Sequence, residues 1–486
     1  MNEYRLPNAK QARFRNKTYQ APIIYDAVKL TDSQKKLGVN LNYHVITYGC
    51  QANVRDGEVI SGILEQMGYT FSDALSKADI IILNTCAIRE NAEKRVLGVI
   101  GSLQSYKRKK PEMVVGICGC MPQQEQMAQN IVAKYPIVEL MFGTHNISSL
   151  PTLLENVLTT RKRNIEVFSA LGSIYEDLPS VRQFRHKAFV NIMDGCDKFC
   201  SYCIVPYTRG QQRSRRWEDI LKEVKRLKEE GYQEITLLGQ NVNAYGKDLD
   251  QGCTFADLLE KVSDTGIRRI RFTTSHPWDF DDRMIDIIAQ RDNIMPFIHL
   301  PLQSGNDEIL KLMNRRYTSK QYKELFDRIK EKIKDVAIST DIIVGFPNET
   351  EEQFSDTLKM VEYCQYDNAY SFVFSAREGT PAARIEDSVS LEEKKRRLQR
   401  LNERLGYYSK LNNKKWEGQV VEVLVDGFSK TNPEIMSGYT PQQKLVNFSY
   451  DNAQIGAIIY VKITQGMKNS LNGVQVHPGK ENHEQY

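Results

Sequence analysis

Short apolar runs alternate with helical segments along most of this chain, and that alternation limits its fold more than any other feature. From Tyr43, the runs HVITY, DIIILNT, MVVGI and VELMFG are each followed by a segment of helical spacing, expected at about 56–67, 88–106, 123–134 and up to about Leu158. Strands that are apolar on both faces belong in a parallel sheet with helices on both sides. Residues 41–158 are therefore predicted to form an α/β domain with a small, doubly wound parallel sheet.

A second alternation follows a polar segment at 159–185, which we interpret as a linker. Its expected strands are AFVNIM, EITLL, RIRFTT, FIHLP, ISTDIIV and YSFVF, and a basic helix is expected over about 390–416. A closed β/α barrel needs eight units, so six units predict a partial barrel over residues 186–412.

The pattern changes again at both ends of the chain. VVEVLVDG, KLVNFSY, AIIYVKITQG and GVQV are short strands joined by turns with Gly and Asn, which is typical of a small β-barrel. We assign this barrel to residues 413–478. Residues 1–40 lack hydrophobic periodicity and are basic, so they are predicted to be an extension that is either mobile or draped over the body.

Composition narrows the class of protein. No apolar run is long enough to span a bilayer and no signal-like segment opens the chain, which predicts a soluble cytoplasmic protein with no membrane partner. The nine cysteines are an odd number in a large chain, and this favours metal ligation over a disulfide framework. The net charge of +5 is mild and does not by itself indicate a nucleic-acid binder.

The run CDKFCSYC places Cys196, Cys200 and Cys203 close together. Three thiolates at this spacing can bind three irons of a 4Fe–4S cluster and leave the fourth iron open. An open iron can bind S-adenosylmethionine, which a reduced cluster can cleave to an adenosyl radical. The alternatives are a zinc knuckle and chance clustering. Zinc usually takes four ligands, and no nearby His or Cys completes such a set.

Three other cysteines occupy equivalent positions in the first alternation. Cys50, Cys86 and Cys120 each follow one of its first three strands. The carboxyl ends of adjacent parallel strands share one edge of a sheet, so these thiols can hold a second iron–sulfur cluster, again with an open iron. The alternative is that they are ordinary buried cysteines. Cys118 competes with Cys120 for the third position.

Several segments carry a family resemblance that extends from about Tyr43 to about Val476. They are VNIMDGCDKFCSYCIVPYTRGQQRSR, TYGCQANVRDGE, NTCAIRENAEKRVLGVIG, GICGCMPQ, FGTHN, LLGQNVNAYG, FIHLPLQSGND, DIIVGFPNET and GYTPQQKLVNF. In these segments the chain resembles the methylthiotransferase branch of the radical S-adenosylmethionine superfamily. CSYCIVPYTRG and GQNVNAYG favour the branch that acts on isopentenyladenosine over its sister branches.

The resemblance implies 2-methylthiolation of N6-isopentenyladenosine on the 3′ side of the anticodon in tRNA. It implies two 4Fe–4S clusters, a radical cluster on Cys196, Cys200 and Cys203 and an auxiliary cluster on Cys50, Cys86 and Cys120, with Cys120 favoured over Cys118 by GCMPQ. Sulfur would be inserted through the auxiliary cluster, and the methyl group would come from a second S-adenosylmethionine. The implied partners are the tRNA anticodon stem-loop, an electron donor such as flavodoxin or ferredoxin, and a sulfur or cluster donor. The chain itself is expected to be a monomer, with a TRAM-like RNA-binding barrel at its end.

The resemblance also implies a cofactor pocket at the strand ends of the partial barrel. Tyr202 stands where the family packs a residue on the adenine. The other predicted cofactor-binding residues are Gly239, Gln240, Asn241, Ser275, Gln303, Asp341 and Gly345. Each of these residues also has a plain interpretation as core, cap or turn.

Contacts with RNA are less well marked in the sequence. Four arginines follow the cluster loop and suit phosphate or carboxylate contacts, although such a run is usually a solvated face; they are Arg209, Arg213, Arg215 and Arg216. Tyr439 and Gln443 replace residues that are usually Arg and Asn in the TRAM pattern. A competing class is a non-catalytic iron–sulfur protein that binds RNA or senses redox state.

Overall fold

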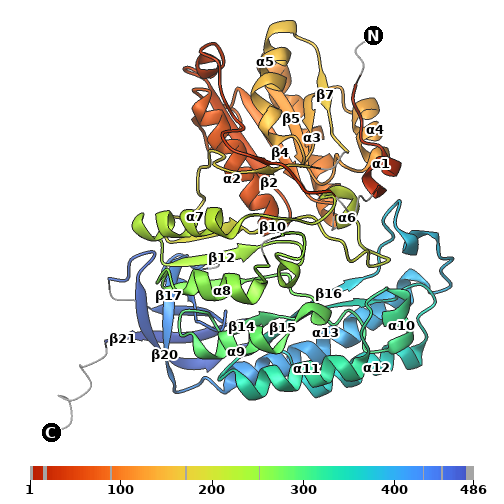
Figure 1. Cartoon of the computed structure of the whole chain (residues 1–486), viewed down its shortest axis with the longest axis vertical. Helices are drawn as coiled ribbons and strands as arrows, with labels where there is room; N and C mark the ends of the chain where they lie inside the picture. The colour runs from red at the N-terminus through yellow and green to blue at the C-terminus, as the bar shows by residue number, and fades with distance from the viewer. Residues whose placement is uncertain are drawn as a thin grey trace.

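The computed structural model describes residues 4–14, 19–87, 90–169, 172–250, 252–430, 432–449 and 452–477. Three consecutive units follow one another along the chain, here named the sheet domain, the partial barrel and the C-terminal barrel. The sheet domain lies at one end of the molecule and the other two units lie side by side at the opposite end (Figure 1). Among the described residues, no helix is both long and apolar enough to cross a lipid bilayer.

The sheet domain is built on a six-stranded sheet with the order β3-β2-β4-β5-β6-β7, in which every pairing is parallel. Its strands are β2 (Asn42–Thr47), β3 (Thr70–Phe71), β4 (Ile80–Thr85), β5 (Val114–Gly119), β6 (Val138–Phe142) and β7 (Asn164–Glu166). Its helices are α2 (Gln51–Gln66), α3 (Glu90–Lys109), α4 (Glu125–Lys134) and α5 (Leu150–Thr160).

Alternate residues of the central strands point to opposite faces of this sheet. Ile80 and Ile82 pack with α2 and α5, whereas Ile81 and Leu83 pack with α3 and α4. Each helix therefore buries an apolar face on one side of the sheet. This arrangement confirms the predicted doubly wound sheet. Ile88, where the second helix was expected to begin, lies outside the described residues.

Two short edge strands of the sheet were missed by sequence reasoning. β3 has two residues and β7 has three, so both lack the apolar run that identified their neighbours. β7 falls inside the segment 159–185 that was interpreted as a linker, and that segment is therefore only partly irregular. The domain boundaries themselves stay predictions.

The partial barrel contains the six expected strands, all paired in parallel. They form two three-stranded sheets, β9 (Lys187–Asn191), β12 (Glu234–Leu238) and β13 (Arg269–Phe272), and β14 (Phe297–His299), β15 (Ala337–Val344) and β16 (Asn368–Val373). The amide of Ile270 donates to the carbonyl of Asn293 at 2.7 Å and links β13 to the segment before β14. The predicted partial (β/α)6 barrel is confirmed.

Helices cover the outside of these strands. They are α7 (Trp217–Glu229), α8 (Phe255–Ser263), α9 (Asp282–Gln290), α10 (Asp307–Leu312), α11 (Ser319–Lys332), α12 (Glu351–Cys364) and α13 (Leu391–Lys414). Thr254, Thr318 and Thr350 each begin a helix with a reciprocal capping box, which satisfies backbone donors that would otherwise be unpaired. These caps fix where the three helices begin. The residues between each strand end and the following cap therefore form loops.

The C-terminal barrel is closed, with the order β17-β18-β19-β21-β20. Its strands are β17 (Val420–Phe428), β18 (Met436–Tyr439), β19 (Leu445–Ser449), β20 (Ile458–Gly466) and β21 (Leu471–Val476). A small barrel was predicted correctly, but with four strands. β18 was missed because MSGY reads as a turn. Gly438 is needed there, since a Cβ at that position would lie 2.3 Å from the Leu424 carbonyl oxygen.

The described part of the N-terminal extension lies on the body. Its short helix α1 (Ala9–Arg13) packs beside α6 (Val205–Thr208) (Figure 1). Its strand β1 (Ile23–Ile24) pairs in parallel with β8 (Ile174–Tyr175). The amide of Arg5 also donates to the carbonyl of Ile165 at 3.0 Å. Of the two alternatives for this extension, its described residues therefore follow the draped one.

Candidate active site

Cys50, Cys86 and Cys120 lie at one edge of the sheet domain. They follow β2, β4 and β5, which are neighbours in the sheet. Gly49, with φ of +124°, packs so closely on Cys86 that a Cβ at position 49 would lie 2.6 Å from the Cys86 Cβ. The amide of Cys120 donates to the carbonyl of Thr85 at 2.8 Å. The structure thus brings together three cysteines from distant parts of the sequence.

Two buried asparagines that sequence reasoning missed support this edge. Nδ2 of Asn84 donates to the Asn53 carbonyl at 2.6 Å, and Nδ2 of Asn53 donates to the Thr85 carbonyl at 3.2 Å. The thiol of Cys50 donates to Oδ1 of Asn53 at 3.3 Å. These bonds tie the first turn of α2 to the end of β4. The only signal in the sequence was that both asparagines stand close to cysteines, in CQAN and NTC.

Cys118 and Cys120 have different surroundings. Cys118 lies on β5 and packs in the core beneath α2 and α5, whereas Cys120 lies beyond the end of β5 and contacts Ala87 and Ile204. Burial raises the pKa of the Cys120 thiol, Arg209 opposes that rise, and Cys50 adds to it. The placement favours Cys120 at the shared edge; its role as a ligand stays a prediction.

The run CDKFCSYC forms a loop after β9 and β10 (Met193–Asp194). Burial raises the pKa of Cys196 to about 12. Burial, Cys200 and Cys196 together raise the pKa of Cys203. Cys200 contributes to both shifts, as expected of neighbouring thiols in one loop. Nη1 of the buried Arg315 donates to Sγ of Cys200 at 3.5 Å.

Both cysteine sets fit an iron–sulfur cluster on their chemistry. No two of the nine cysteines, all of which lie in the described ranges, form a disulfide. In the part of the chain that the structure describes, no three His, Cys, Asp or Glu side chains converge on the position of a single ion. A 4Fe–4S cluster takes each thiolate on a different iron, so a spaced trio of thiols is the donor set that it needs.

Three of the residues predicted to bind the cofactor carry a buried polar atom without a partner. Oδ1 of Asn241, Oγ of Ser275 and Oε1 of Gln303 have no hydrogen bond within the described residues. They follow β12, β13 and β14, at the carboxyl ends of successive strands. Buried polar atoms are nearly always hydrogen-bonded, so these three atoms fit a site that binds a polar ligand.

Two predicted glycines and a glutamine are held in tight backbone positions. A Cβ at Gly239 would lie 2.5 Å from Cγ of Met193. Oε1 of Gln240 accepts from the Gly195 amide, which precedes the first cysteine of the cluster loop. Gly345 has φ of +66°, and its amide donates to Oε2 of Glu349 at 2.7 Å.

Tyr202 and Asp341 have contacts that an ordinary structural role also explains. Tyr202 is partly buried beside Phe346 and Phe374. Oδ2 of Asp341 lies 3.4 Å from Nε2 of His299. Their roles toward a cofactor stay predictions.

Comparison with known proteins identifies the family. Three profiles match, described as the Radical SAM superfamily at residues 190–361, the Uncharacterized protein family UPF0004 at 42–143 and the TRAM domain at 414–476. A tRNA-2-methylthio-N(6)-dimethylallyladenosine synthase of Staphylococcus epidermidis is 50% identical over 98% of this chain and 92% of its own. One from Staphylococcus aureus (strain MRSA252) is 49% identical over 97% and 91%. The chain belongs to this methylthiotransferase family.

Family membership makes the protein a radical S-adenosylmethionine enzyme that transfers alkylthio groups, with an iron–sulfur cluster and S-adenosylmethionine as cofactors. The zinc and non-catalytic alternatives are thereby set aside. Among solved structures, a radical S-adenosylmethionine methyltransferase from Kitasatospora setae aligns with a TM-score of 0.46 at 13% identity, over 71% of this chain and 77% of that chain.

The arginines after the methylthiotransferase cluster loop are not a solvated face. Arg209 pairs with Asp56, Arg215 pairs with Glu176 and Glu223, and Nη1 of Arg213 donates to the carbonyls of Arg209 and Gln211. All three arginines are shielded from solvent. Arg216, which pairs with Glu218, is the most exposed of the four. The carboxylate alternative is therefore correct for Arg209 and Arg215, and these two are not free for RNA phosphates.

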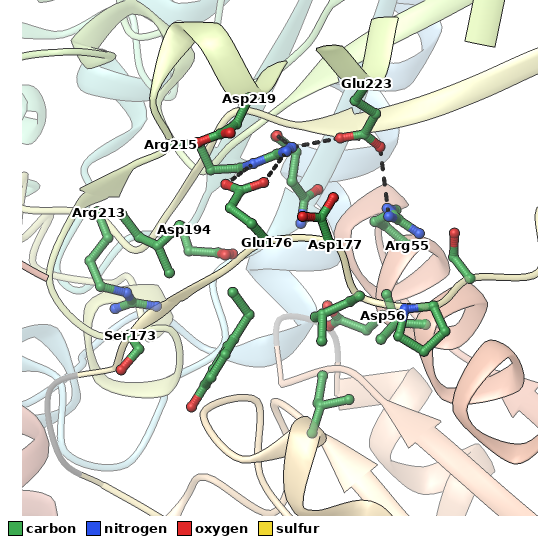
Figure 2. Close-up of a pocket in the computed structure, with 18 of the residues that line it drawn as sticks. Arg55, Asp56, Ser173, Glu176, Asp177, Asp194, Arg213, Arg215, Asp219 and Glu223 are labelled. Carbon is green, nitrogen blue, oxygen red and sulfur yellow. Dashed lines mark hydrogen bonds and ion pairs between the residues drawn. The ribbon is translucent and has the colours of Figure 1, made fainter. Parts of the chain in front are cut away.

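An ion-pair network joins the sheet domain to the partial barrel. Figure 2 shows Arg55 of α2 directed at Glu223 of α7, which also binds Arg215. Burial alone would raise the pKa of Glu223, but Arg215, Arg55 and Arg182 hold it down at about 2. The two units are thus held together by buried charge as well as by apolar packing.

Basic residues of α3, of the turn after it and of α13 are also engaged within the chain. Their partners are Glu139 for Lys107, Asp79 for Lys110, Asp387 for Lys394, Glu393 for Arg396, Glu349 for Arg397 and Glu351 for Arg400. Runs of basic residues in the sequence therefore do not locate the surface that would bind RNA.

Proposed function

We propose that this methylthiotransferase converts N6-isopentenyladenosine, on the 3′ side of the anticodon in tRNA, to its 2-methylthio form. The names of its relatives support this substrate. The observation that carries the proposal is the meeting of the two cysteine sets. Cys120 packs against Ile204, the residue that follows Cys203. The two cysteine sets would therefore be close enough for clusters held by each of them to act on the same substrate base.

Cys196, Cys200 and Cys203 would hold the radical cluster, and Cys50, Cys86 and Cys120 would hold the auxiliary cluster through which sulfur is inserted. A reduced 4Fe–4S cluster with an open iron supplies reductive cleavage of S-adenosylmethionine to an adenosyl radical. C2 of the adenine base carries a C–H bond without useful acidity, so a general base could not activate it. A second S-adenosylmethionine would supply the methyl group.

The chain's own side chains would orient the cofactor. The partnerless atoms of Asn241, Ser275 and Gln303 are placed to bond with its polar groups. Gly239 would permit a close approach of the backbone. Tyr202 would pack against the adenine.

The tRNA would reach this pocket with help from the C-terminal barrel, which matches the TRAM domain. Outside the chain, we propose an electron donor such as flavodoxin or ferredoxin and a donor of sulfur or clusters, with the enzyme acting as a monomer. The reaction needs both supplies, because reductive cleavage consumes an electron and each turnover consumes a sulfur atom.

The test is mass spectrometry of tRNA nucleosides from a strain that lacks the protein. The 2-methylthio nucleoside should disappear, isopentenyladenosine should accumulate, and the wild-type chain should reverse both changes. Cys200→Ala and Cys120→Ala chains should not. Unchanged 2-methylthio nucleoside in the deletion strain would contradict the proposal.

A further inference from the structure

Trp278 is an exposed aromatic residue on the rim of the partial barrel. It lies in the short 3₁₀ helix η4 (Pro277–Asp279), which follows the carboxyl end of β13 and Ser275. Its relative exposure is 45%. Trp is enriched at binding interfaces because its ring offers a large contact area, so this exposed position beside the mouth of the barrel is a candidate binding surface.

The backbone beneath Trp278 is firmly held. Nδ1 of the buried His276 accepts from the Trp278 amide at 3.3 Å. The next residue, Asp279, is buried and accepts from Nδ2 of Asn241 at 2.8 Å and from Nζ of Lys247 at 2.6 Å. The indole is therefore presented on a fixed support, and little conformational entropy is lost when a partner binds it.

Two cations lie against the Trp278 ring. Nζ of Lys198 is 4.5 Å and Cζ of Arg316 is 5.0 Å from the ring centroid. Lys198 belongs to the cluster loop, between Cys196 and Cys200, and also pairs with Asp279. Through Lys198, the Trp278 ring is thus in direct contact with the loop that contains Cys196, Cys200 and Cys203.

Arg316 is the cation that remains available to a ligand. Its side chain is exposed, and within the described residues its one polar contact is Nε to Oδ1 of Asn314 at 3.5 Å, with no ion pair. Its loop is fixed to the cluster loop, because Nδ2 of Asn314 donates to the carbonyl of Phe199 at 2.9 Å. An exposed guanidinium beside an exposed indole can contact a base and its phosphate together.

We propose that Trp278 and Arg316 form a stacking platform for an unpaired loop nucleobase of the RNA substrate, next to the base that enters the pocket. RNA loops are recognised chiefly through unstacked bases that pack on aromatic and arginine side chains. The platform would hold the loop while the target base is turned toward the strand ends. This inference rests on the proposed function, since it takes RNA as the substrate.

The chain offers a matched control on its outer surface. Tyr363 of α12 is 46% exposed, and Nζ of Lys323 lies 4.5 Å from its ring centroid. It therefore has the same kind of aromatic–cation pair as Trp278, but on an outer helix of the partial barrel instead of a strand-end loop. If any exposed aromatic–cation pair bound RNA, the two sites would behave alike.

The experiment measures binding of a fluorescent anticodon stem-loop that carries isopentenyladenosine to the cluster-loaded full-length chain. Trp278→Ala should weaken binding by about 5- to 150-fold, the range for one base–aromatic stack, and Trp278→Phe should weaken it less. Tyr363→Ala should leave affinity within twofold of the parent. Arg316→Ala should weaken binding and lower the dependence of log affinity on log salt by about one, whereas Trp278→Ala should leave that slope unchanged.

Affinity of Trp278→Ala within twofold of the parent, or an equal loss in Tyr363→Ala, would overturn the platform. The iron content of each variant is first compared with that of the parent. If Trp278→Ala fails to load its clusters, the salt dependence of binding by Arg316→Ala decides whether the platform contacts the RNA. A parent chain that neither binds nor modifies the stem-loop would instead count against the proposed function. If the parent modifies the RNA and the platform variants bind it normally, the platform is refuted and the proposed function stands.

Discussion

Nε of Arg209 donates a hydrogen bond to Sγ of Cys120 at 3.3 Å. Arg209 follows the radical-cluster loop, whereas Cys120 belongs to the sheet domain, so the contact joins the two cysteine-bearing units. The same guanidinium pairs with the buried carboxylate of Asp56 on α2. Under the proposed assignment of Cys120 to the auxiliary cluster, this bond would tune the cluster, as hydrogen bonds to cluster sulfurs do.

Removing Arg209 should destabilise the junction of the two units. Arg209→Gln leaves Asp56 buried without its cation, which should cost about 3–5 kcal/mol of unfolding free energy. Arg209→Gln combined with Asp56→Asn should cost less than either single change, because no charge is left uncompensated. Urea unfolding of the metal-free chain measures this double-mutant cycle, and additive losses would show that the pair does not interact.

Replacing Cys200 should remove one ligand of the radical cluster. Cys200→Ala is expected to abolish reductive cleavage of S-adenosylmethionine, measured as 5′-deoxyadenosine formed with dithionite. The matched control is Cys253→Ala, since Cys253 is a buried cysteine of the partial-barrel core outside both sites. Undiminished 5′-deoxyadenosine from Cys200→Ala would refute the ligand assignment.

Replacing Cys50, Cys86 and Cys120 together should separate the two clusters. The triple alanine variant should retain the iron of one cluster and still cleave S-adenosylmethionine, yet form no methylthiolated nucleoside. In a variant that lacks both Cys118 and Cys120, restoring Cys120 should recover the second cluster and restoring Cys118 should not, because Cys118 packs inside the core. Methylthiolation by the triple variant would mean that these cysteines are structural.

The Glu223 network should make stability depend on pH. The folded-state pKa of about 2 lies below the ordinary 4.5, so this stabilisation is present above about pH 5 and is lost as pH falls toward 2. The full difference is on the order of 3 kcal/mol. Glu223→Gln should flatten the fall in unfolding free energy between about pH 5 and 3. Glu230→Gln, which removes an exposed partner of Arg226, should leave that fall unchanged.

Local sequence pattern predicted the strands that are apolar on both faces, such as β4 and β5, and so placed Cys86 and Cys120 at one edge. It missed β18 and β7, whose short sequences lack an apolar run and gain their strand pairing only from neighbours in the fold. It could not show that Arg209 is buried, because its partner Asp56 lies 153 residues away. Pairings of this kind depend on how the units dock, which no local pattern records.

The C-terminal barrel is more closely tied to its neighbour than the sequence indicated. The fully buried Arg269 donates to Glu422 and to the Tyr439 carbonyl, and Arg271 donates to the carbonyls of Thr440 and Pro441. Truncation before Trp416 would leave these arginines without their barrel partners. The truncated chain is therefore expected to lose stability, seen as a lower unfolding midpoint, along with any loss of RNA affinity. An unchanged midpoint would show that the barrel is an independent unit.

Radical methylthiolation is tested most directly by tracing the hydrogen atom at C2 of isopentenyladenosine. A stem-loop RNA with deuterium at C2 of isopentenyladenosine is incubated with the cluster-loaded chain, reductant and S-adenosylmethionine, and the products are weighed by mass spectrometry. Radical methylthiolation predicts deuterium in 5′-deoxyadenosine together with a 2-methylthio nucleoside that has lost it. Deuterium retained in the RNA, with 5′-deoxyadenosine formed unlabelled, would contradict radical methylthiolation of this base.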